Sequence, residues 1–124
     1  MTISNVWILL CDASHARLLE THGRVHVWRS VRELRRGNAL DVDEWIRMLA
    51  GLLGQGRLWK RYSKLVLVAP PEVLEALRAA LTDEVADLVL ASIPRDLVDA
   101  SMRELPELLY ADVRPRPRAP EISV

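Results

Sequence analysis

Three acidic residues are candidates for metal-dependent hydrolysis. Asp12 directly follows an apolar run, Glu44 lies at the start of an expected helix, and Asp96 follows the last apolar run. An enzyme that cleaves phosphodiesters with two divalent ions needs several carboxylates around those ions, which stabilise the attacking and leaving oxygens. The apolar run at 65–69 should end in a further acid, but two prolines follow it. A metal-dependent hydrolase or nuclease is therefore the alternative interpretation of this chain, not the leading one.

Asp12 also has a simpler interpretation. The sequence Asp-Ala-Ser at 12–14 separates two strand-like segments. An aspartate in such a short link commonly accepts a hydrogen bond from a backbone N–H two residues further on, which forms an Asx turn. We therefore expect Asp12 to shape the backbone and to take no part in bond cleavage.

Histidine and cysteine form no recognisable catalytic or metal-binding pattern. The three histidines fit no common zinc spacing. Ser14 and His15 lie too close to Asp12 along an extended chain to align as nucleophile, base and acid. Cys11 is the only cysteine and ends an apolar run, so we expect it to be a small core residue. We expect no metal site and no cofactor.

The basic residues are clustered, although 17 basic and 17 acidic residues give a formal net charge of zero. Arginine beside tryptophan is the chemistry of RNA contact, through phosphate neutralisation and base stacking. The same residues also occur in ordinary solvated surfaces and sheet packing. The candidate RNA-binding residues are Arg24, Arg29, Arg32, Arg35 and Arg36 with Trp28, and Arg57, Lys60, Arg61 and Lys64 with Trp59.

The first half of the chain predicts three strands and a helix. An apolar run at 5–11 and strand-like segments at 15–22 and 25–31 favour an antiparallel meander, with a tight turn at Gly23 between the second and third strands. Asp41 and Glu44 have the spacing of a capping box. Apolar residues then recur at helical spacing until 53, and a glycine should end the helix at 54.

The second half predicts two more strands joined by helices. The run at 65–69 is a buried strand, and the prolines after it can open a helix that ends near 81. A further strand is expected at 88–93 and a helix at 97–109, with a break at Pro106. Residues 111–124 contain alternating arginine and proline and should form an extended tail.

This succession of elements predicts one α/β domain at residues 1–110. Helical crossovers favour parallel pairing of the later strands, so the chain should form a three-layer sandwich around a five-stranded mixed sheet. The strand order 3-2-1-4-5 of ribonuclease-H-like folds fits, because it places the continuously apolar first strand at the centre. No run is long enough to span a membrane and no targeting segment is visible, so we expect a cytoplasmic protein without a membrane partner.

Three motifs in this order resemble a known family. Residues 7–19 read as a strand, a turn and an Ala-Arg-aliphatic strand; 65–78 as a strand entering a helix with a Leu-Arg pair; and 93–97 as a basic-Asp-Leu step. This pattern is similar to the "protein required for attachment to host cells" family, which is grouped with bacterial relatives of the archaeo-eukaryotic peptide-chain release factor through the factor's middle domain. The residues that carry the resemblance are Asp12, Ala16, Arg17, Pro70, Arg78, Asp96 and Leu97.

The resemblance implies a mixed sheet and a connection with the ribosome or tRNA. In release factors a Gly-Gly-Gln loop before the first helix is needed for release, but here residues 35–40 read Arg-Arg-Gly-Asn-Ala-Leu. Our leading hypothesis is therefore a non-catalytic domain that binds the ribosome, tRNA or another structured RNA. A protein-interaction module or homo-oligomer is a further alternative.

Overall fold

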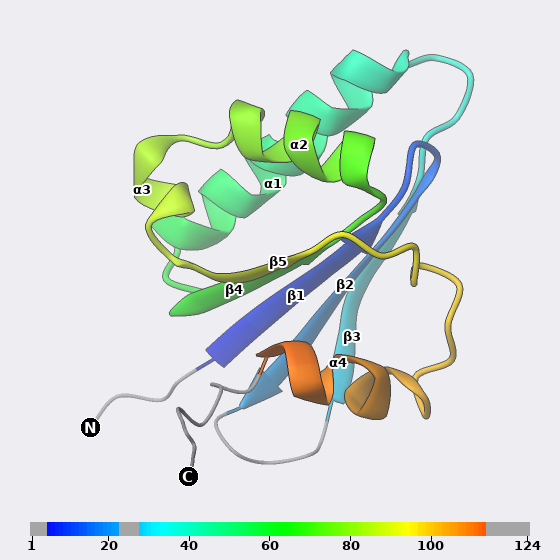
Figure 1. Ribbon diagram of the computed structural model, residues 1–124. Helices are drawn as coiled ribbons and strands as arrows, with labels where there is room; N and C mark the ends of the chain where they lie inside the picture. Colours follow the sequence, from blue (N-terminus) through cyan, green and yellow to red (C-terminus); the bar gives the residue numbers. More distant parts are fainter. Residues whose placement is uncertain (1–4, 23–27, 114–124) are drawn as a thin grey trace, which may run out of the picture.

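The first three strands form the antiparallel half of a five-stranded sheet. The computed structural model describes residues 5–22 and 28–113 (Figure 1). Strand β1 (Asn5–Cys11) pairs antiparallel with β2 (His15–His22), and β2 pairs antiparallel with β3 (Trp28–Arg35). The turn expected at Gly23 lies outside the described residues, and the third strand extends further along the chain than the expected 25–31.

Parallel pairing extends the sheet on the other side of β1. Strand β4 (Lys64–Val68) pairs with β1, and β5 (Val89–Ile93) pairs with β4. The resulting order, β3-β2-β1-β4-β5, confirms the prediction. The central position of β1 agrees with its apolar sequence, since residues buried on both faces of a sheet need no polar alternation.

Helices cover both faces of the sheet (Figure 1). Helices α1 (Val42–Leu58), α2 (Pro71–Ala80) and the short α3 (Asp83–Ala86) lie on one face, and α4 (Leu105–Val113) lies on the other. Each face has its own apolar core: Leu9, Leu18 and Leu49 belong to the first, and Ile8 and Leu10 to the second. The predicted three layers are therefore present, and no helix within the described ranges is long and apolar enough to cross a membrane.

The sequence predicts that helix α1 ends at Gly54, but the helix continues to Leu58. A glycine inside a helix costs about 1 kcal/mol relative to alanine. The last turn nevertheless forms, because Leu53 and Gly56 on its inner side are buried. Gly56 lies against the rings of Trp7 and Tyr62, so packing outweighs the intrinsic cost of the glycines.

The helix expected at 97–109 was also placed too early, since α4 begins at Leu105. The carbonyls of Val98 and Ala100 accept hydrogen bonds from the Arg17 guanidinium, at 2.9 and 2.5 Å, in place of helical partners. Ser101 and Glu104 then exchange side chain–backbone hydrogen bonds in a capping pattern, so the helical turns start there. Pro106 is near the helix start and causes no break. Helix α4 runs to Val113, residues 114–124 lie outside the described part, and the domain boundary at 110 stays a prediction.

Candidate functional site

Asp12 is a turn residue, as predicted. Its Oδ1 accepts hydrogen bonds from the backbone N–H groups of Ser14 and His15, both at 2.8 Å. Its own N–H donates to the His15 carbonyl at 2.9 Å, which closes the link between β1 and β2. The Asp12 carbonyl accepts a hydrogen bond from Trp45 Nε1 on α1. The carboxylate thus shapes the backbone on which α1 rests.

The other two acidic candidates are not gathered around a common point. Glu44 Oε1 accepts from the Asp41 N–H at 2.9 Å, and Asp41 Oδ1 accepts from the Glu44 N–H at 2.8 Å, which confirms the capping box. Asp96 is exposed in the segment after β5. In the part of the chain that the structure describes, no three histidine, cysteine or acidic side chains are placed to hold one metal ion.

Most arginines of the first basic cluster have partners within the protein. Arg29 forms an ion pair with Glu20 at 2.5 Å, and an Arg35 nitrogen lies 3.8 Å from a Glu33 oxygen. Arg36 donates to the carbonyls of Ala13 and Leu40. Trp28 is half-buried and packs against the core on the α4 face. Arg24 lies outside the described residues, and Arg32 is exposed without an ion pair among them.

Glu20 is a buried acid on the α1 face of β2. Its carboxylate accepts from Trp7 Nε1 at 3.2 Å and from Arg29. Burial disfavours its charged form, but the hydrogen bonds and the positive charge of Arg29 outweigh burial, so the pKa of Glu20 lies below its usual value. The charged carboxylate therefore stabilises the folded state at neutral pH.

We expect Glu20→Gln to make folding less sensitive to acid. Because the folded-state pKa is lowered, the contribution of Glu20 is complete above its unfolded-state pKa of about 4.3 and disappears as the pH falls through the folded value. At pH 7 the variant should lose about 1–2 kcal/mol, since a charge-assisted hydrogen bond becomes neutral. Urea unfolding between pH 7 and pH 3 measures both effects.

Glu33, whose pKa is also lowered, chiefly by its hydrogen bond with His15, titrates in both proteins. Parallel stability-against-pH curves for the two proteins would contradict the role given to Glu20.

The second basic cluster begins with Arg57 in the last turn of α1 and continues through the connection that leads to Lys64 at the start of β4. The Arg61 N–H donates to the Gly56 carbonyl at 2.8 Å and the Lys60 N–H to the Arg57 carbonyl at 3.0 Å, the hydrogen-bond pattern of a Schellman motif. Lys60 occupies the left-handed position with φ 55°, where glycine is usual. The helix therefore ends with a strained lysine beside Trp59.

Trp59 is 75% exposed, which is unusual for a tryptophan. The cations near it make no ion pair among the described residues. The α1-end surface, as we call this group, comprises Arg57, Trp59, Lys60, Arg61 and Lys64. Tyr62 does not belong to it. Its hydroxyl donates to the Leu53 carbonyl at 2.7 Å, its ring contacts Trp7, and burial raises its pKa to about 12.

Two polar contacts were missed by sequence reasoning. His15 is buried, with Nε2 at 2.6 Å from Glu33 and Nδ1 at 3.4 Å from Asp99. Arg17 reaches across to the segment before α4. His15 and Arg17 alternate along β2 and so point to the same face of the sheet. This alternation could have shown that His15 and Arg17 share one face of the sheet. It could not have shown their partners, which lie 18 and more than 80 positions away in the sequence.

The residues that carried the family resemblance lie mainly at structural positions. Ala16 is buried in the core beneath α1, Pro70 precedes α2, and Leu97 packs against the second core. Arg78 is exposed on α2. Ala16, Pro70 and Leu97 lie at a strand, a helix start and a core contact, which is why the pattern accompanies this fold, whereas Arg78 and Asp96 are exposed.

Comparison with known families gives one match. Residues 29–109 match the model described as "Bacterial archaeo-eukaryotic release factor family 12". No curated protein matches significantly.

Several solved structures are similar at low sequence identity. An "Archaeal protein" matches with a TM-score of 0.51 and 16% identity over 88% of this chain and 34% of its own. The archaeal translation termination factor aRF1 matches with a TM-score of 0.48 and 16% identity, over 86% of this chain and 41% of its own. Dom34 of S. cerevisiae, a translation termination-like factor, matches with a TM-score of 0.47 and 6% identity, over 86% of this chain and 38% of its own. The chain thus spans about a third to two fifths of these proteins, and the first similarity supports the fold assignment.

Proposed function

The chain belongs to bacterial archaeo-eukaryotic release factor family 12, and from that premise we propose that it is a non-catalytic domain that binds structured RNA of the ribosome through the α1-end surface. The exposure of Trp59 among cations that form no ion pair within residues 5–22 and 28–113 is the observation that supports this proposal. A flat aromatic side chain offers a stacking surface to an unpaired base, and the neighbouring cations neutralise phosphates.

The geometry of α1 supports this choice of surface over the first basic cluster. Arg29 and Arg36 already hold a buried carboxylate and backbone carbonyls, so their use by RNA would cost intramolecular contacts. RNA could bind the four cations of the α1-end surface without breaking an ion pair among the described residues. Helix α3, which contacts α1 (Figure 1), carries Asp83 and Glu84 and is followed by Asp87, so the neighbouring element is acidic.

The chain also lacks the residues that release would require. The loop before α1 contains no Gly-Gly-Gln tripeptide. We therefore propose binding without peptidyl-tRNA hydrolysis. The narrower resemblance to the host-attachment group and a cytoplasmic location stay predictions from the sequence.

An RNA-binding titration tests the proposal. Purified ribosomal RNA and tRNA are each titrated with the protein at several salt concentrations. Replacing Arg57, Lys60, Arg61 and Lys64 by glutamine should weaken binding about 100-fold at low salt and reduce the slope of log affinity against log salt by about three. Trp59→Ala should weaken it about tenfold with an unchanged slope, because stacking carries no counterion release.

Three exposed arginines elsewhere provide the matched control. Replacing Arg47, Arg78 and Arg103 by glutamine removes a similar charge but leaves the α1-end surface intact, so binding should change less than threefold. Equal losses in both variants would mean diffuse attraction to a polyanion, and would overturn the proposed surface. Absence of binding at low salt would overturn the RNA proposal itself.

A further inference from the structure

Strand β3 is an edge of the sheet. It pairs with β2 on one side, and within the described residues no strand pairs with its other side. Its outward backbone N–H and C=O groups are therefore available to a further strand. The register with β2 shifts between Leu18 and Leu19, so the regular part of this edge is the stretch that runs from Arg32 to Arg35.

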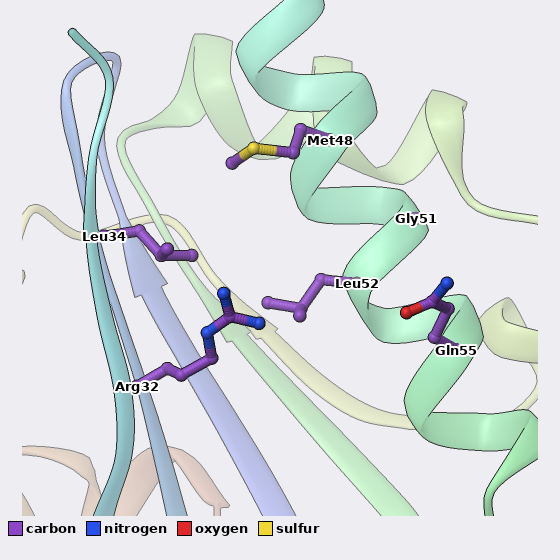
Figure 2. Close-up of a pocket in the computed structure, with 6 residues that line it drawn as sticks. All are labelled: Arg32, Leu34, Met48, Gly51, Leu52 and Gln55. Carbon is purple, nitrogen blue, oxygen red and sulfur yellow. The ribbon is translucent and has the colours of Figure 1, made fainter.

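A groove of about 270 Å³ lies beside that stretch, between β3 and α1. Figure 2 shows Arg32 and Leu34 extending from β3 toward Met48, Leu52 and Gln55 of α1. Met48 is 39% exposed, although it is apolar. A Cβ added at Gly51, which also lines the groove, would meet nothing within 4 Å. The groove is therefore open, mainly apolar between Arg32 and Gln55, and closer in size to one or two side chains than to a large ligand.

The groove is basic as well as apolar. Arg32 is exposed at its rim and makes no ion pair among the described residues. None of the described residues that line the groove is acidic. The nearest acid in sequence, Glu33, is hydrogen-bonded to His15 on the opposite face of the sheet. Charge complementarity therefore favours an occupant with a carboxylate opposite Arg32.

A second copy of the chain fits this edge poorly when the strand pair is centred on Arg32. In an antiparallel pair of β3 strands centred on Arg32, that residue would face its own copy, and Arg29 would face Arg35. Like charges directly opposite each other destabilise a strand pair. RNA offers anionic phosphates to Arg32, but it has no peptide backbone that could form strand hydrogen bonds with β3.

We propose that this groove binds an extended acidic peptide of a partner protein as a sixth strand. The peptide pairs its backbone with β3 between Arg32 and Arg35. It places an apolar side chain against Leu34, Met48 and Leu52, and the acidic side chain two residues away, on the same face, against Arg32. Alternate side chains of a strand point to one face, so an apolar and an acidic side chain two residues apart can contact the groove at the same time.

The test uses a blocked heptapeptide, Thr-Leu-Thr-Glu-Thr-Val-Thr, and ¹⁵N-labelled protein observed by NMR. Saturable shifts confined to β3 and the facing side of α1, with a Kd of about 10–100 µM, support the proposal, as expected for a short strand added to a sheet edge. Arg32→Glu should weaken this peptide at least tenfold and should bind the Thr-Leu-Thr-Lys-Thr-Val-Thr peptide better than the unmodified protein does. Arg103→Glu changes the same charge away from the groove and should leave both affinities unchanged.

Each other result contradicts the proposal. Shifts that appear with protein concentration alone would make a second copy the occupant. Shifts of β3 caused by an RNA hairpin and not by the peptide would make the groove an RNA site. If Arg32→Glu leaves the selectivity between the two peptides unchanged, the carboxylate contact is ruled out. If millimolar peptide causes no shifts, the docking site is ruled out. Apart from the RNA hairpin result, none of these outcomes bears on the α1-end surface, so failure of the peptide proposal leaves the proposed function untouched.

Discussion

Gly56→Ala is expected to destabilise the protein by about 3 kcal/mol, at the upper end of the usual cost of overpacking. The added Cβ would lie 2.5 and 2.8 Å from two ring atoms of Trp7 and 3.0 Å from the Tyr62 ring. The Trp7 ring cannot turn away without losing the hydrogen bond from its Nε1 to Glu20. The helix must therefore move off the sheet, and its last turn carries the α1-end surface.

Gly54 provides the matched control for this prediction. It lies in the same helix, but a Cβ there would meet nothing within 4 Å. Gly54→Ala should therefore stabilise the protein by about 1 kcal/mol, because alanine is the better helix former. Urea unfolding followed by circular dichroism measures both variants. A shift of both in the same direction would contradict the close packing of Trp7 on α1.

Trp45→Ala is expected to destabilise the protein by about 3–5 kcal/mol, the usual cost of removing a buried aromatic side chain. Trp45 is fully buried, and its Nε1 donates to the Asp12 carbonyl at 2.9 Å. The variant would leave a cavity between α1 and the sheet and a carbonyl without its donor. We expect a lower midpoint of urea unfolding and loosened amide exchange in the Asp12 turn.

Two variants separate packing from hydrogen bonding at this site. Trp45→Phe keeps part of the ring contact but removes the donor, so its loss should be smaller, about 1–3 kcal/mol. Trp59→Ala, at the exposed tryptophan that caps the C-terminal end of the same helix, should change stability by no more than about 0.5 kcal/mol. Equal effects at both tryptophans would mean that α1 is not anchored as the structure describes.

Local patterns in the sequence correctly predicted the architecture and the first turn. The continuous apolar run of β1 indicated a strand buried on both faces, and the succession of strands and helices then favoured the observed order. Asp12 and the Asp41–Glu44 pair form their predicted hydrogen bonds. These features involve residues two or three positions apart, so their geometry follows from neighbouring backbone alone.

The tertiary structure alone decided where α1 ends, where α4 begins and which cations are available to a partner. The glycines of α1 suggested an end at 54, but contacts with Trp7, nearly fifty residues away, keep the last turn helical. The sequence placed Arg29 and Arg57 in equivalent basic clusters, although only Arg29 is paired with a buried acid. Helix ends and ion pairs of this kind depend on small energy differences between distant groups, which a pattern of neighbouring residues does not contain.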